Sequence, residues 1–312
     1  MEHLLISVNA VVPFVCYIGY GYIARRLGAA SEDFLKKLNR MVFRLFFPFL
    51  TFYSFCRIDG GFNADPLYLA VCGLSSVVLV LILVLIVPRL VSANERRGVI
   101  IQAIFRSNTI LFAMPMVESI YGISHVALTS VVITIVVPIY NVLSVIVLAY
   151  YGEGRTDIRS LVKGVLTNPL IDGALAGLAL YLLHIRLPEA ILTPVGAISN
   201  MTTPLALFIL GGTLHFSAIG GNAKAIIGTL SVKLVLLPAI ALAIAMALKF
   251  DSFERFLFFA LFATPVATAS FPMAASMGGD GELAGQLVML STVASVLTLF
   301  LWITALAGTG ML

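Results

Sequence analysis

The sequence predicts an all-α integral membrane protein with ten transmembrane helices, arranged as two inverted five-helix repeats in which helices 4 and 9 are broken and cross. Composition is the first observation: 60% of the 312 residues are hydrophobic, 11% are charged and the mean hydropathy is +1.07, whereas soluble domains are roughly half apolar and a quarter charged. The second is a set of ten long apolar segments. The third is a proline among polar residues in two corresponding segments, a pattern typical of transporter binding sites.

The ten segments are each long enough to cross a bilayer, which takes about 20 apolar residues. They are numbered here as spans 1 to 10 and lie at residues 4–24, 34–56, 67–88, 98–120, 125–150, 165–184, 190–212, 225–248, 254–277 and 283–307. We expect span 1 to be retained rather than cleaved as a signal peptide, because Glu2 precedes it, Arg25 and Arg26 follow it, and no small-residue cleavage pattern ends it.

The basic residues predict the orientation. With the N-terminus outside, twelve lysines and arginines fall in the inside loops: Arg25, Arg26, Lys36, Lys37, Arg40, Arg89, Arg96, Arg97, Arg155, Arg159, Lys163 and Lys224. Four fall outside: Arg57, Arg186, Lys249 and Arg255. Because cytoplasmic loops carry the excess of positive charge, both termini are predicted outside a plasma (inner) membrane, where the inside loops face anionic lipid.

Short sequence similarities between the two halves predict that the second half repeats the first. Three pairs recur at offsets of 157, 156 and 151 residues: Pro115 with Pro272, Pro48 with Pro204, and Asn141 with Thr292. Five spans per half is an odd number, so the second half enters the membrane upside down. We therefore expect repeats at residues 1–150 and 165–312, joined by a charged connector.

The two proline-bearing segments are predicted to form a binding site. Proline removes a backbone donor and disturbs the preceding turn, and the freed carbonyl must find a partner or line a cavity. A break near mid-membrane leaves half-helices whose N-terminal amides carry about half a positive charge, which favours a carboxylate over a sugar. The neutral hydrogen-bonding residues beside the breaks are Asn108, Thr109, Thr268 and Ser270. The alternative is a simple kink, which spanning helices tolerate.

Two further pairs of small polar residues are predicted to face this crossing. Asn141 and Ser144 are three residues apart on span 5, as are Thr292 and Ser295 on span 10, so each pair shares one helical face. These residues either contact a ligand or join helices by hydrogen bonds. For Asn141 we favour ligand contact.

Lys233 is a charge within span 8, about eight residues and roughly 12 Å from its cytoplasmic end. An ammonium at that depth needs a partner and is functional by default. Three roles stay open: a fixed cation that supports the crossing, a direct counter-charge for the substrate, or a group that carries a proton. We favour the first, since span 3 offers only Ser75 and Ser76 at the corresponding depth.

Three other ionisable residues lie within spans. Arg106 and Arg44 either extend to the lipid headgroups or act where the substrate enters. Glu118, three residues beyond Pro115, either pairs with a cation or carries a proton.

The sequence argues against an enzyme. The four histidines and three cysteines show neither metal-ligand spacing nor a triad pattern, and the phosphate-cradling GxxxxGK[ST] motif is missing. No metal, other cofactor or nucleic-acid partner is expected. A membrane-embedded enzyme or a channel-like receptor is kept as the less favoured class.

Four motifs carry a family resemblance: FRSNT at 105–109 followed by Pro115, VPIYNVLSV at 137–145, VKLVLLP at 232–238, and the segment 264–272. Together they resemble the auxin efflux carrier family, whose bacterial members are similar to plant auxin exporters and, more distantly, to bile-acid sodium symporters. The resemblance implies that spans 1, 2, 6 and 7 form a scaffold and that spans 3–5 and 8–10 form a moving transport domain in which spans 4 and 9 cross at their prolines. It also implies small organic anions, especially carboxylates, as substrates.

The predicted function is export of a small organic anion by an elevator form of alternating access, with sodium- or proton-coupled carboxylate uptake as the alternative. A homodimer through spans 2 and 7 is expected. The predicted substrate-binding residues are Asn108, Thr109, Met114, Pro115, Asn141, Ser144, Thr268, Ser270, Pro272, Met273, Thr292 and Ser295. The predicted coupling or supporting residues are Lys233, Glu118 and Arg106.

Overall fold

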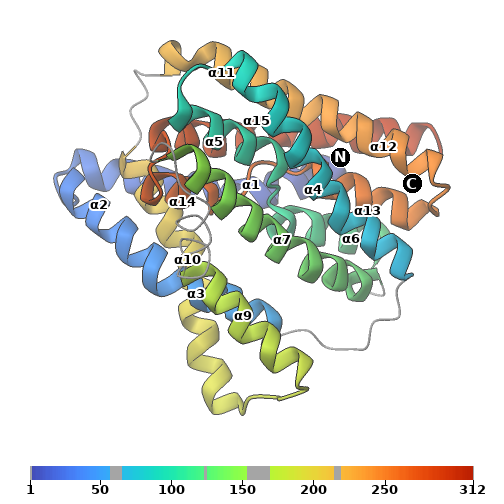
Figure 1. The fold of residues 1–312 in the computed structure, drawn as a ribbon, viewed down its shortest axis with the longest axis horizontal. Coiled ribbons are helices and arrows are strands. Elements are labelled where there is room, and N and C mark those ends of the chain that lie inside the picture. The colour runs from blue at the N-terminus through green and yellow to red at the C-terminus, as the bar shows by residue number, and fades with distance from the viewer. Residues whose placement is uncertain (1, 57–64, 123–124, 153–168, 214–218, 312) are drawn as a thin grey trace.

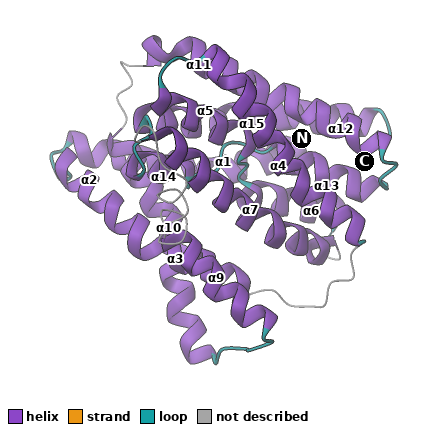
Figure 2. Ribbon diagram, in the orientation of Figure 1, coloured by secondary structure: helices purple, strands orange, loops and turns teal. Residues whose placement is uncertain are grey.

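The computed structural model describes residues 2–56, 65–122, 125–152, 169–213 and 219–311, and these residues form helices and short connections (Figures 1 and 2). The α-helices are α1 Glu2–Arg26, α2 Glu32–Met41, α3 Phe47–Cys56, α4 Pro66–Leu90, α5 Asn94–Phe105, α6 Met114–Tyr121, α7 Val126–Gly152, α9 Pro169–Leu182, α10 Glu189–Thr213, α11 Ile219–Ser231, α12 Leu237–Ala247, α13 Ser252–Ala263, α14 Ser270–Ser276 and α15 Gly281–Gly308. The predicted connector between the halves lies largely outside the described residues.

Five helical segments in the described ranges are long and apolar enough to cross a membrane: Pro66–Leu90, Leu128–Gly152, Glu189–Thr213, Gly221–Ala247 and Gly281–Gly308. They coincide with predicted spans 3, 5, 7, 8 and 10. The prediction of an all-α, multi-pass membrane protein is confirmed. The number ten and the inverted repeats stay predictions, because predicted spans 1, 2, 4, 6 and 9 are not among these five segments.

Prolines widen three helices without ending them. The π-helical turns η1 Val42–Phe46, η2 Thr109–Ala113 and η5 Val232–Leu236 each end two residues before a proline, at positions 48, 115 and 238. Proline cannot donate to the carbonyl four residues earlier and its ring crowds it, so a wider turn relieves the clash. The Leu234 carbonyl, four residues before Pro238, instead accepts from the indole Nε1 of Trp302 at 3.0 Å. That bond joins the span-8 helix to α15.

Helix packing divides the described chain into two groups. In the first, α1 packs on α10 and α3 on α9; in the second, α4, α5, α7 and α11–α15 pack on one another. Helix α1 also packs on α15 and so joins the two groups. Figure 1 shows α3, α9 and α10 together below the second group. Glycines allow the close contacts of the first group, since a Cβ on Gly211 would lie 1.9 Å from the Ile18 carbonyl oxygen and one on Gly173 would lie 2.2 Å from the Pro48 carbonyl oxygen.

Loops predicted on the same side of the membrane meet in the structure. At one end of the second group, the Arg96 guanidinium pairs with the Asp280 carboxylate at 3.0 Å. At the opposite end, the Tyr121 hydroxyl donates to the Ser252 carbonyl at 3.2 Å, and the Ser252 hydroxyl donates to the Met311 carbonyl at 3.3 Å. These loops therefore lie at the same two ends of the helix group as the predicted topology requires. The charge bias predicts that the end with Arg96 is cytoplasmic.

Cysteine labelling checks this orientation. In a variant whose three native cysteines are replaced by serine, we expect Ser92→Cys to react with an impermeant thiol reagent only from the cytoplasmic side, because it lies beside Arg96. Ala190→Cys, at the start of α10, should react from outside. The reverse pattern in intact cells would contradict the orientation.

Candidate binding site at the helix crossing

The chain crosses itself where α5 and α13 end. After α5 the backbone is non-helical over residues 106–108, and after α13 over residues 264–267. The two breaks pair as a short antiparallel bridge between Ser107 and Val266. The Asn108 amide donates to the Pro265 carbonyl at 2.8 Å, and the Ala267 amide donates to the Arg106 carbonyl at 3.1 Å. Non-helical backbone inside a membrane must be satisfied by protein, and here each break satisfies the other.

The crossing lies before the two prolines that were predicted to cause it, and this part of the prediction is wrong. The first break contains no proline, and Pro115 follows it only after the π-helical turn η2. The second break contains Pro265, whereas Pro272 is the third residue of α14. Pro272 sits in the first turn of α14, where a missing backbone donor costs little, whereas Pro115 is the seventh residue of the helical stretch that starts at Thr109 and is accommodated by the wider turn η2. The breaks are instead held by the backbone pairing.

Buried polar atoms without a hydrogen-bond partner gather around the crossing. Of the eleven such atoms in the described part of the chain, six lie on the two broken helices or on the neighbouring α7 and α14: Gln102 Oε1, Asn108 Nδ2, Thr109 Oγ1, Ser144 Oγ, Thr264 Oγ1 and Ser270 Oγ. Each such atom costs about 1–3 kcal/mol in a protein interior. A cluster of them is rare in a native structure and marks a place built to receive polar groups.

Arg106 is a buried cation within this cluster, with 5% of its surface exposed. Its guanidinium donates to the Asn141 amide oxygen of α7 at 2.6 Å and to the Met273 sulfur of α14 at 2.6 Å. Both partners are neutral, and no ion pair between described residues includes Arg106. The side chain therefore joins three elements of the crossing while its charge stays uncompensated by them.

Lys233 reaches the crossing from span 8. It lies in the π-helical turn η5, is fully buried, and donates from Nζ to the Ser107 hydroxyl. Ser107 is the residue whose backbone forms the bridge to Val266. The ammonium therefore contacts the break itself, which supports the first of the three roles considered for it.

The remaining predicted residues form three sets: those whose side chains lie at the crossing or near it, those whose side chains the structure does not describe, and those whose hydroxyls bond within α15. Asn141, Ser144, Thr268, Pro272 and Met273 are buried on or beside the elements of the crossing, whereas Met114 is half-buried at the start of α6. The side chains of Pro115 and Glu118 lie outside the description.

Thr292 and Ser295 form the third set. Their hydroxyls donate within α15, to the Val288 and Thr292 carbonyls at 2.7 Å each. The sequence predicts that these two hydroxyls face the crossing, but in the structure each hydroxyl proton is used in a bond within α15.

Sequence reasoning missed two hydroxyls that hold the crossing. Ser107 accepts from Lys233, and Ser291 of α15 accepts from the Val266 amide at 3.1 Å. Ser107 lies inside the FRSNT motif and Ser291 directly precedes Thr292, but neither has a residue-type signal that separates it from its polar neighbours. Gln102, one turn before Arg106, was also overlooked; a polar amide in an apolar span was the available signal.

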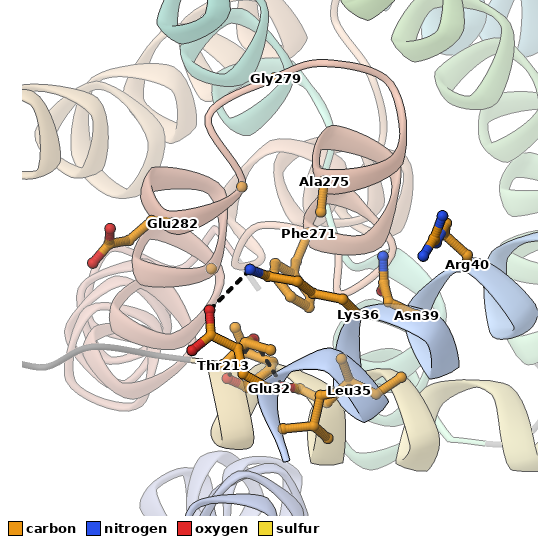
Figure 3. A pocket seen from close by; sticks show the side chains of 14 residues that line it. Glu32, Leu35, Lys36, Asn39, Arg40, Thr213, Phe271, Ala275, Gly279 and Glu282 are labelled. Carbon is orange, nitrogen blue, oxygen red and sulfur yellow. Dashed lines mark hydrogen bonds and ion pairs between the residues drawn. The ribbon is translucent and has the colours of Figure 1, made fainter. Parts of the chain in front are cut away.

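A cavity of about 520 Å³ lies between the two helix groups. Figure 3 shows Lys36 and Asn39 of α2 across from Phe271 and Ala275 of α14. Its lining also includes residues of α10 and α15, and Phe271 of this lining directly follows Ser270 in the chain. The Asn39 amide donates across the cavity edge to the Ser276 hydroxyl at 3.3 Å.

Charged residues surround the mouth of this cavity. Lys36 and Arg25 each hydrogen-bond the Glu32 carboxylate at 2.9 Å and, with Lys36 the larger cause, lower the pKa of Glu32 to about 2. Glu32 is therefore ionised at neutral pH and offsets part of the local positive charge. Lys36 and Arg40 leave cationic groups on the α2 side of the mouth.

Comparison with known proteins identifies the class. A family model described as membrane transport protein matches residues 6–159 and 155–303. The chain belongs to this family, the auxin efflux carrier family that its motifs resemble. The protein is a membrane transporter and not an enzyme. No curated protein matches the chain.

Replacement of Lys233 tests its contact with the crossing. Lys233→Ala removes the donor to buried Ser107 and leaves a void, so we expect the free energy of unfolding to fall by about 1–3 kcal/mol or more. Lys224→Ala, exposed on α11 just before span 8, should change it by less than about 0.5 kcal/mol. Thermal unfolding in detergent measures both. Normal unfolding of Lys233→Ala with loss of ligand affinity alone would assign the ammonium to the ligand instead.

Proposed function

We propose that this transporter exports a small organic anion, a carboxylate, by an elevator form of alternating access. The observation that carries the proposal is the pair of buried cations, Arg106 and Lys233, at a crossing lined by buried polar atoms that lack partners. A buried cation is costly unless an opposite charge accompanies it. A carboxylate would supply that charge and would accept hydrogen bonds from Asn108 and Thr109.

The helix that follows the first break adds to this preference for an anion. Helical structure continues through η2 and α6 from Thr109 to Tyr121, and the Asn108 carbonyl accepts from the Phe112 amide at 3.2 Å. The first-turn amides of such a helix have no partner within it, and its dipole places partial positive charge at the crossing. A carboxylate oxygen is suited to these donors, whereas a neutral sugar would gain less from the dipole.

The packing of the helices supports an elevator. We assign α1, α2, α3, α9 and α10 to the scaffold and α4–α7 with α11–α15 to the transport domain. The crossing belongs entirely to the second group, so the site would move with it as a unit. The cavity lies between α2 and α10 on one side and α14 and α15 on the other, and it would provide the cytoplasmic route to the crossing.

Sodium- or proton-coupled carboxylate uptake is the alternative mode. The position of Lys233 argues against sodium at the crossing, because its ammonium already donates to Ser107. A second cation beside it would be repelled. We therefore propose transport that does not require sodium.

We also propose a homodimer through spans 2 and 7, because a scaffold must stay fixed while the transport domain moves. Phe49 of α3 and Leu81 of α4 are both exposed apolar residues, one in each group. Disulfide crosslinking between two copies should occur with Phe49→Cys in the membrane and not with Leu81→Cys. Crosslinks formed only through Leu81→Cys would contradict a dimer that forms through the scaffold.

Flux measurements test the proposed function. Proteoliposomes are assayed with labelled acetate, benzoate, succinate and citrate, with sodium or choline as the cation and with or without a pH gradient. At least one anion should show saturable flux. Asn108→Ala should weaken its apparent affinity about 5- to 100-fold, corresponding to the loss of a buried hydrogen-bond donor.

Asn200→Ala is the matched control, because Asn200 is exposed on α10; it should transport like the wild type. Absence of saturable flux for all four anions would contradict the proposed substrate class. If Asn108→Ala kept the wild-type affinity for the anion, the crossing would not be the binding site.

A further inference from the structure

Among the described residues, no ion pair compensates the charge of Arg106. Its guanidinium contacts Asn141 of α7 and Met273 of α14, and neither α7 nor α14 contains an aspartate or a glutamate. The acids of α5 and α13, Glu95 and Glu254, lie in the first turns of those helices, at the ends far from the crossing.

Glu118 is the other acid on an element of the crossing. It lies nine residues beyond Thr109 on the continuous helix η2–α6, which at 1.5 Å per residue places its backbone roughly 13 Å farther along the axis. An arginine side chain does not lose its proton in proteins. The transport domain without substrate therefore carries at least one fixed positive charge at its centre, to which the Lys233 ammonium adds when protonated.

This charge affects the two movements of an elevator differently. With a bound carboxylate, the negative charge offsets that of Arg106 while the domain passes the apolar scaffold. Without substrate, the same movement takes an uncompensated charge through low dielectric, where its electrostatic cost is much greater than in water. The loaded domain should therefore cross readily and the empty domain should cross slowly.

We propose that this protein is an anion exchanger, in which the domain that has released one carboxylate returns with another anion bound. The proposal rests on the proposed function and adds the mode of transport to it. Arg106 is the substrate-binding residue on which this coupling depends: it binds the transported anion and, by its charge, retains the empty domain. No covalent step is involved, since one anion leaves as another enters.

The test compares exchange with net efflux. Proteoliposomes are loaded with whichever labelled carboxylate of the panel shows saturable flux, then diluted into buffer with the same unlabelled anion or into buffer with an impermeant anion such as gluconate. In the wild type, label should leave at least about tenfold faster when the external carboxylate is present.

Arg106→Gln should bring the two rates within about twofold of one another, because the empty domain is then less charged. Arg89→Gln is the control: Arg89 is exposed at the end of α4 and donates to the Leu85 carbonyl of its own helix. It should keep the wild-type ratio of rates.

The outcomes separate this inference from the function on which it rests. Saturable flux with equal rates of exchange and net efflux in the wild type would overturn the exchanger and leave the anion transporter intact, and this arm needs no variant to fold. An unchanged ratio in a folded Arg106→Gln would also overturn it. No saturable flux under either condition would contradict the transport function itself.

Discussion

The structure of the central site depends on the backbone pairing between the two broken helices. Ser107 and Val266 face each other, and the flanking amides of Asn108 and Ala267 donate to carbonyls of the opposite break. Without this pairing, two stretches of non-helical backbone would be left unsatisfied within the bundle, at a cost of several kcal/mol for each polar group in lipid. The side chains that support it, Lys233 and Ser291, bind the same two segments.

The crossing also explains why cations are buried in so apolar a chain. Arg106 is held at the end of α5 because its carbonyl accepts from Ala267, so its side chain has to lie among α7 and α14. The resulting charge is costly for an empty protein and favourable for one that holds an anion. Stability of the empty site and affinity for its ligand are therefore opposed, which is a common property of functional sites.

The class of protein was predictable because lipid restricts the chain so strongly. Long apolar segments can only be helices, and a polar, proline-bearing segment in each half indicates discontinuity. The exact break points were not predictable, since Pro115 widens a turn whereas the first break has no proline at all. Partners across the fold were equally hidden: the contacts of Lys233 with Ser107 and of Arg106 with Met273 join residues more than 100 positions apart. Thr292 and Ser295 have the right spacing, but their hydroxyls bond within their own helix.

A structure with a bound heavy-atom carboxylate shows whether the crossing binds the anion. The purified protein is soaked or co-crystallised with para-bromobenzoate, and bromine is located by anomalous diffraction. We expect one bromine site at the crossing, with the carboxylate within hydrogen-bond distance of the Asn108 side-chain Nδ2 and the Arg106 guanidinium. Bromine bound only at the cavity mouth, beside Lys36 and Arg40, with the crossing unchanged, would contradict it.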